Sequence, residues 1–203
     1  MIPVLCVLVF GMIEFAFVMR DYAAVSSLVR SGARIASTGA DHGRAVCESG
    51  AGAPVCSPGS TPALAQEAAD AVQRSGSAMT PDQIEYVMIY KANIKGFPGV
   101  EGNTTMPTNC AGTASCVMYT WRPALDQFKY NSGAWDSQSI SACFPGNSTT
   151  PMDRVGVYLK SNHKMLTGLF GASLALTDRA VMDFEPLATA NCNGKGPAAG
   201  GHQ

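Results

Sequence analysis

The sequence predicts an α+β protein. We expect one long N-terminal helix, embedded in a membrane over its first half, to pack on a small antiparallel sheet with disulfide-stapled loops. Three observations carry this prediction: an apolar N-terminus that runs on into an amphipathic helical pattern, four later segments with strand periodicity, and six cysteines in loop-rich sequence. The chain divides into a membrane half of the helix (1–19), an amphipathic half (20–38), an extracytoplasmic α+β head (39–192) and a flexible tail (193–203).

The apolar stretch Met1–Met19 carries one charged residue, Glu14. Nineteen helical residues measure about 28 Å, close to the roughly 30 Å hydrocarbon core of a bilayer. A cleaved signal peptide is disfavoured, because no Lys or Arg precedes the stretch and no A-x-A-like site follows it. Glu14 is then either an interfacial carboxylate, snorkelling or protonated, or an acid that pairs with an amine or hydroxyl of a neighbouring helix.

The helical pattern continues past Arg20 and Asp21. One face recurs at spacings of three and four, and it consists of Val18, Tyr22, Val25, Val29, Gly32 and Ala36. Proline is absent from Val4 to Ala53, and Gly39 and Gly43 offer a C-terminal stop. The predicted helix runs from about Pro3 to Thr38, a length of about 54 Å.

Later segments predict one short helix and four strands. Thr61 to Arg74 has the composition of a helix, with Thr61 as its N-cap and Pro62 at its first position. The strands are expected at 83–94, 115–121, 153–165 and 173–185, because these segments alternate with period two and are rich in β-branched and aromatic residues.

Six of the seven cysteines lie beyond the apolar stretch, which indicates three disulfides formed in an oxidising compartment. Six cysteines allow 15 pairings. Pairing cysteines that are neighbours in the sequence gives the disulfides Cys47–Cys56, Cys110–Cys116 and Cys143–Cys192, and it leaves Cys6 as a free thiol. Six buried thiols are the alternative, and a zinc site is less favoured because no CxxC occurs and no His is spaced near a cysteine pair.

Composition and motifs argue against several classes of function. Charged residues make up 14% of the chain, against about a quarter in typical soluble domains, and 21 glycines and 12 prolines indicate a loop-rich body. The net charge is −1 and no Lys/Arg-rich run occurs, so a nucleic-acid partner is not expected. His42, His163 and His202 fall in no catalytic or metal-binding motif. We therefore expect no enzyme, no catalytic or metal site and no cofactor.

Two stretches resemble a known family. The segment "IPVLCVLVFGMIEFAFVMRDYAAVSSLVRSGARIAS" resembles the N-terminus of TadE-like pseudopilins of the tight-adherence (Tad, or Flp) pilus system. The matching residues are Pro3, Gly11, Ile13, Glu14, Phe15, Gly32, Ala33, Arg34 and Ala36. The segment "LTDRAVMDFEP" (176–186) is similar to the closing strand of that family. Members of this family carry a basic leader and a cleavage site upstream of the proline.

The resemblance implies a structural subunit with a pilin-like helix, a minor pseudopilin of a Tad/Flp-type (type IVc) pilus that acts in pilus assembly, surface adherence and biofilm formation. The implied membrane and assembly residues of the helix are Pro3, Gly11, Glu14, Phe15 and Tyr22. The implied partners are other pilin or pseudopilin subunits, the inner-membrane assembly platform and the lipid bilayer. The implied location is the inner membrane, which the chain would cross once with its C-terminus outside. Incorporation into an extracellular pilus is the second implied location.

The alternative function is a membrane-anchored extracellular binding module or adhesin that acts outside a filament. Such a module needs an exposed apolar or aromatic patch on the head. The candidate residues are Trp121, Tyr130 and Trp135.

Overall fold

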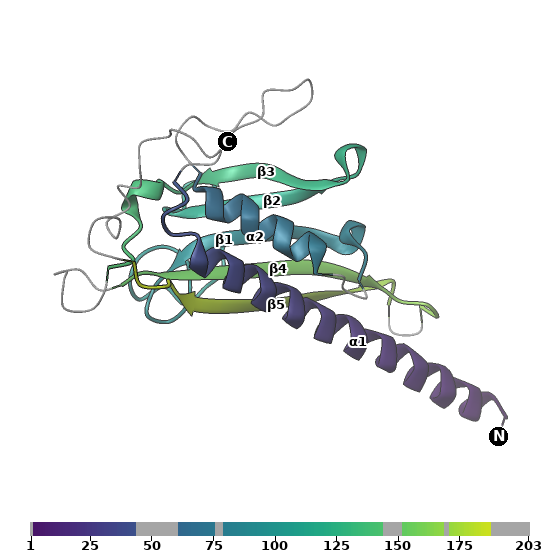
Figure 1. Ribbon diagram of the computed structural model, residues 1–203. Coiled ribbons are helices and arrows are strands. Elements are labelled where there is room, and N and C mark those ends of the chain that lie inside the picture. The colour runs from purple at the N-terminus through teal and green to yellow at the C-terminus, as the bar shows by residue number, and fades with distance from the viewer. Residues whose placement is uncertain (1, 44–60, 76–78, 144–151, 169–170, 188–203) are drawn as a thin grey trace.

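A computed structural model describes residues 2–43, 61–75, 79–143, 152–168 and 171–187. The helices are α1 (Ile2–Thr38) and α2 (Ala63–Arg74), and the strands are β1 (Ile84–Ala92), β2 (Cys116–Arg122), β3 (Gln127–Ala134), β4 (Arg154–Lys164) and β5 (Ser173–Asp183). Three 3-10 turns are η1 (Pro81–Gln83), η2 (Pro123–Leu125) and η3 (Ser137–Ser139). Both helices lie on one face of the sheet, and the first half of α1 projects beyond it (Figure 1). The predicted α+β fold is confirmed.

The sheet has the strand order β3-β2-β1-β4-β5, and every neighbouring pair is antiparallel. Four of its strands correspond to the four predicted ones. The prediction missed β3, whose sequence QFKYNSGA is polar and mostly exposed or half-buried. Only Phe128 of this edge strand is fully buried, so its residues do not alternate between apolar and polar. The register between β2 and β3 also shifts between Met118 and Tyr119, which further disturbs the periodicity.

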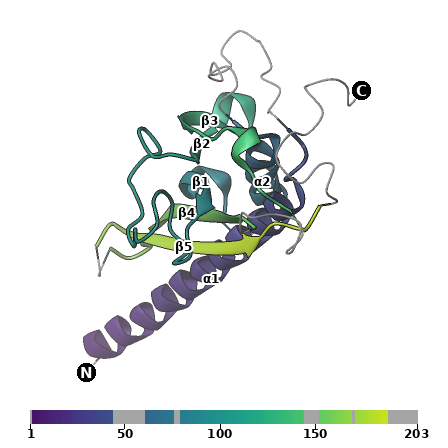
Figure 2. The ribbon, with the colours of Figure 1, turned by 90° about the vertical axis from the view of Figure 1, so that its left-hand side faces the viewer.

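The central strand β1 is buried on both faces. Val87 and Ile89 belong to the core between sheet and helices, whereas Met88 and Tyr90 belong to a second cluster on the opposite face. The loop between β1 and β2 lies on that opposite face (Figure 2). Burial raises the pKa of Tyr90 to about 12. The Tyr90 hydroxyl donates a hydrogen bond to the Gly96 carbonyl oxygen at 3.1 Å.

The second half of α1 forms the centre of the main core. Its buried apolar side chains are Ala24, Val25, Leu28, Val29, Ala33 and Ala36. Gly32 permits close packing on α2, because a Cβ there would lie 3.0 Å from Val72 Cγ2 and 3.4 Å from the Ala68 carbonyl oxygen. The predicted N-cap of α2 is wrong: the helix begins at Ala63, Pro62 occupies the cap position without a side-chain hydrogen bond, and Thr61 is buried.

The segment that leaves β5 closes the core. Ala180, Met182 and Phe184 pack on the helix side of the sheet as predicted, and Phe184 is only 1% exposed. Its ring centroid lies 6.4 Å from that of Trp135. The amide of Glu185 donates to the Ser37 carbonyl oxygen at 3.0 Å, so the chain after β5 is joined to the end of α1.

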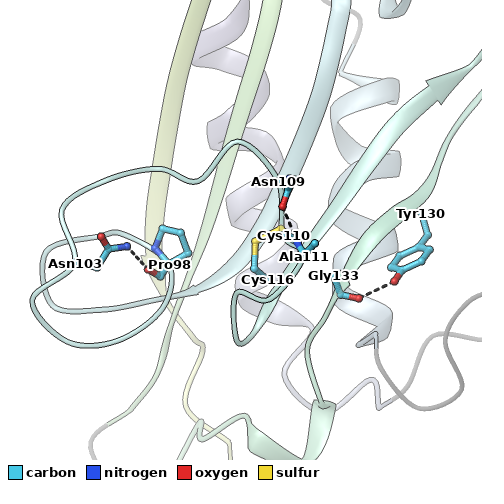
Figure 3. The surroundings of a disulfide bond; sticks show 8 residues. All are labelled: Pro98, Asn103, Asn109, Cys110, Ala111, Cys116, Tyr130 and Gly133. Atoms are coloured by element: carbon cyan, nitrogen blue, oxygen red, sulfur yellow. Dashed lines mark hydrogen bonds between the residues drawn. A yellow bond between two sulfur atoms is a disulfide. The ribbon is translucent and has the colours of Figure 1, made fainter.

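One predicted disulfide, Cys110–Cys116, closes the end of the β1–β2 loop (Figure 3). Gly133 of β3 lies against it with φ +100°, and a Cβ there would be 2.5 Å from Cys110 Cβ and 2.2 Å from the Cys116 carbonyl oxygen. Cys143 is also disulfide-bonded, and Cys6 is exposed and free. Cys47, Cys56 and Cys192 lie outside the described residues, so the other two predicted pairings stay predictions.

We expect Phe184→Ala to lower the free energy of unfolding by about 3–5 kcal/mol, because it empties a buried aromatic position. Asp183→Ala should change it by no more than about half a kcal/mol, because this exposed carboxylate forms a surface ion pair with Arg154, at 3.6 Å, and surface pairs contribute little. Urea unfolding of the full chain in mild detergent measures both. If Asp183→Ala lowers the free energy of unfolding more than Phe184→Ala does, Asp183 rather than Phe184 faces the core.

Peptide mapping without reduction should recover Cys110 linked to Cys116, with Cys47–Cys56 and Cys143–Cys192 as the other bridges. Cys6 should be the one thiol alkylated in the unreduced, unfolded chain, because the other six are oxidised. Alkylation of Cys47, Cys56 or Cys192 would contradict the predicted set.

Candidate assembly site on the N-terminal helix

The first half of α1 exposes an unusual amount of apolar surface. We call its exposed side chains the apolar band, which comprises Val4, Leu5, Val7, Leu8, Val9, Phe10, Met12, Ile13, Phe15, Phe17 and Met19. This part of the helix projects past the sheet (Figure 1). Contiguous apolar surface of this kind marks a site of protein or membrane contact, because water disfavours it.

The sequence predicts that residues 1–19 form a membrane-embedded half of α1. Within the part of the chain that the structure describes, no helix is both long enough and apolar enough to cross a membrane.

Glu14 lies in the middle of the apolar band but is only 2% exposed. Thr167, in the turn between β4 and β5, donates two hydrogen bonds to its carboxylate. The backbone amide of Thr167 donates to Oε1 at 3.3 Å, and its hydroxyl donates to Oε2. The hydroxyl partner expected from a neighbouring helix is therefore present within the same chain.

A second buried polar contact lies two turns further along α1. Asp21 Oδ2 and His163 Nδ1 of β4 are 2.6 Å apart, and both residues are buried. Arg20 Nε lies 3.9 Å from the other Asp21 oxygen. His163 Nε2 is buried and has no hydrogen-bond partner among the described residues. The two contacts connect the hairpin of β4 and β5 to α1 at Glu14 and at Asp21.

The sequence contains a signal for this arrangement that was not among the predictions above. Glu14, Val18, Asp21, Val25 and Leu28 recur at spacings of four and three, so the two acids lie on the stripe that α1 turns toward the head. The helical pattern instead predicts Tyr22 on the packed face. That assignment is wrong: Tyr22 is 46% exposed, and the neighbouring Asp21 occupies the buried position because His163 partners its carboxylate.

The other predicted assembly residues are spread around α1. Pro3 is in the first helical turn, where proline is tolerated. Gly11 is half-buried, and Phe15 is 65% exposed as part of the apolar band. The site thus combines exposed apolar side chains with partnered acids, and its chemistry is that of packing and hydrogen bonding. Among the described residues, no group of three His, Cys, Asp or Glu side chains is arranged to hold a metal ion.

Thr167→Val should loosen the turn between β4 and β5, because it removes the hydroxyl that donates to the buried carboxylate. Exchange of the Thr167 backbone amide with solvent deuterium should rise by about an order of magnitude, as expected for losing a hydrogen bond to a charged group. Thr177→Val, at an exposed position of β5, is the matched control and should leave exchange unchanged. Equal protection of the turn in both variants would contradict the role given to Thr167.

The N-terminal residues also match a known family. Residues 1–34 match the sequence model of the family described as TadE-like protein. Comparison with curated proteins and comparison with solved structures each gave no match. The family match covers the whole apolar band, Glu14, Asp21 and the first buried turns of α1. Over residues 1–34, which form most of α1, this chain is similar to TadE-like proteins.

Proposed function

We propose that the protein is a structural subunit, a minor pseudopilin, of a Tad-type pilus. The observation that carries this proposal is the apolar band on the helix that matches the TadE-like family. The head contacts α1 from Glu14 onward and leaves the band uncovered, so a partner of apolar chemistry is needed. Packing among the N-terminal helices of other pilin or pseudopilin subunits would bury the band.

In this proposal the subunit resides at the inner membrane before assembly, with its head outside, and contacts the assembly platform there. The Cys110–Cys116 disulfide supports an oxidising, extracytoplasmic compartment for the head. From that position the subunit enters or initiates the filament and so contributes to adherence and biofilm formation.

The adhesin alternative finds less support in the head. Trp135 is buried, and Trp121 and Tyr130 are partly buried against the main core. These three aromatic residues therefore do not form the exposed patch that a stand-alone adhesin would require.

Phe15→Asp tests the proposal, because it introduces a charge into the apolar band without touching the head. Sheared-pilus yield should fall strongly in cells that carry only this variant, while the Cys110–Cys116 disulfide still forms. Val100→Asp is the matched control: Val100 is 79% exposed in the β1–β2 loop, and its variant should give normal pili. Normal pili from Phe15→Asp would refute an assembly role for the band.

Glu14→Gln separates the charge of Glu14 from its hydrogen bonds in the same assay. Gln keeps one acceptor oxygen for Thr167, so the head should remain folded. We expect incorporation of the variant into pili to fall while the head stays folded, because the charge of Glu14 aids assembly in this proposal. Wild-type incorporation would limit Glu14 to fixing the turn on α1.

A further inference from the structure

The face of the sheet opposite the helices is only partly covered. The β1–β2 loop packs on the half that carries Tyr90, whose hydroxyl donates to the Gly96 carbonyl oxygen in that loop (Figure 2). On the other half, nearer the projecting part of α1, all side chains but Tyr86 are exposed or half-buried. We call this half the open sheet face. Its residues are Glu85, Tyr86, Thr120, Arg122, Lys129, Asn131, Tyr158, Lys160, Asn162, Thr177 and Arg179.

The strand register places these side chains next to one another. One row across the sheet consists of Lys129, Thr120, Tyr86, Lys160 and Thr177. Directly paired residues of antiparallel strands share one face, and Lys160 Nζ lies 5.7 Å from the centroid of the Tyr86 ring. The row crosses all five strands, a width of about 19 Å at the usual strand spacing. The open sheet face is therefore broad enough for several units of an extended polymer.

Cations outnumber acids on the open sheet face. Four strands contribute one cation each, namely Arg122 on β2, Lys129 on β3, Lys160 on β4 and Arg179 on β5. The acid among these residues is Glu85 of β1, and Lys160 Nζ lies 2.9 Å from its carboxylate. The guanidinium carbon of Arg179 lies 3.6 Å from the centroid of the Phe97 ring, so the loop fixes this cation at the border of the face.

Arg122 and Lys129 are the cations available to a partner. Within the described parts of the chain, neither forms an ion pair. Asp82 and Asp126 lie in the turns before β1 and β3, at the border of the face, and neither reaches ion-pair distance of the two cations. Two unpaired cations on neighbouring strands favour an anionic partner.

Uncharged hydrogen-bonding groups lie between the cations. Thr120, Asn131, Asn162 and Thr177 are exposed or half-buried. Among the residues described, the large apolar side chains that are exposed all lie elsewhere, and Tyr86 is only 8% exposed. The open sheet face thus offers hydroxyl, amide and cationic groups, and a partner would contact it through hydrogen bonds and charge.

This chemistry disfavours two classes of partner. Protein interfaces are anchored by aromatic or aliphatic side chains that enter pockets, and the open sheet face presents no large exposed apolar side chain among the described residues. Single-stranded nucleic acids stack their bases on exposed aromatic rings, whereas Tyr86 is buried and Tyr158 is half-buried against it. A sugar polymer that carries carboxylates fits better, because its hydroxyl groups match the Thr and Asn side chains and its carboxylates match the cations.

We propose that the open sheet face binds an acidic polysaccharide. The polymer lies across the strands, its carboxylates pair with Arg122 and Lys129, and its hydroxyl groups exchange hydrogen bonds with the Thr and Asn side chains between the cations. This activity goes beyond the proposed function, because neither the apolar band nor Glu14 takes part in it. It gives the head a ligand of its own, outside the packing of subunits.

Binding of the full chain, in mild detergent, to immobilised polygalacturonate tests the inference. The wild type should be retained and should elute as salt is raised, because salt screens the ion pairs. Lys129→Glu and Arg122→Glu should each weaken binding by at least about tenfold, since each replaces a charged hydrogen bond by a repulsion. Arg34→Glu is the matched control: it makes the same charge change on the exposed side of α1, in the other layer of the head, and should leave binding unchanged.

Asn131→Ala separates recognition of sugar from simple ion exchange. It removes an exposed amide without changing charge, so binding at fixed salt should weaken while the salt dependence stays that of the wild type. Lys129→Gln should instead reduce the salt dependence, and it is the second variant if Lys129→Glu does not fold. Formation of the Cys110–Cys116 disulfide checks the fold of each variant.

Several outcomes would overturn the inference. Unchanged binding of both charge-reversal variants would do so, as would wild-type binding of Asn131→Ala or equal retention of the wild type on duplex DNA, because binding would then depend on charge alone. Loss of pili from Lys129→Glu would also overturn it, since the face would then be a contact between subunits. The proposed function fails separately: Phe15→Asp should lose pili and still bind polygalacturonate.

Discussion

The structure depends on one constraint: a carboxylate inside an apolar helical segment must find hydrogen-bond donors to replace water. Leaving Glu14 without donors would be unfavourable in any apolar environment, because an ionised group loses its hydration there. The turn after β4 supplies the amide and hydroxyl of Thr167. To reach that level of α1, β4 and β5 must run past the end of β1, and this accounts for their eleven-residue lengths in a sheet whose other strands are shorter.

Around this contact, the usual distribution of residues on a surface helix is inverted. The acids Glu14 and Asp21 face the protein, and aromatic and aliphatic side chains face outward. A helix that is stable in water turns its apolar stripe inward. From about Asp21 onward α1 follows this normal rule, since Val25, Leu28 and Val29 are buried in the head. The change of pattern within one helix lies where α1 leaves the head and its exposed side chains become apolar.

The sequence predicted the parts of the fold that rest on periodicity. The helix that ends at Thr38, the four apolar strands and the facing of Phe184 follow from spacing alone. β3 was missed because an edge strand with one fully buried residue has little apolar alternation to detect. The pairs Glu14–Thr167 and Asp21–His163 join residues about 150 positions apart, so no local pattern could match the partners. The sequence does place both acids on the buried stripe of the helix. That position indicates that each acid has a hydrogen-bond partner, but it does not identify the partner residue.

The attachment of α1 to the head has a mechanical consequence. The contacts run from Glu14, held by Thr167, to Ser37, whose carbonyl accepts the Glu185 amide. They span about 35 Å of a helix that is about 55 Å long. A helix that is attached to the head at two distant points cannot rotate relative to the head. Torque or tension applied to the free end of α1 would therefore turn the whole head as a lever, and bending would concentrate in the turns before Glu14.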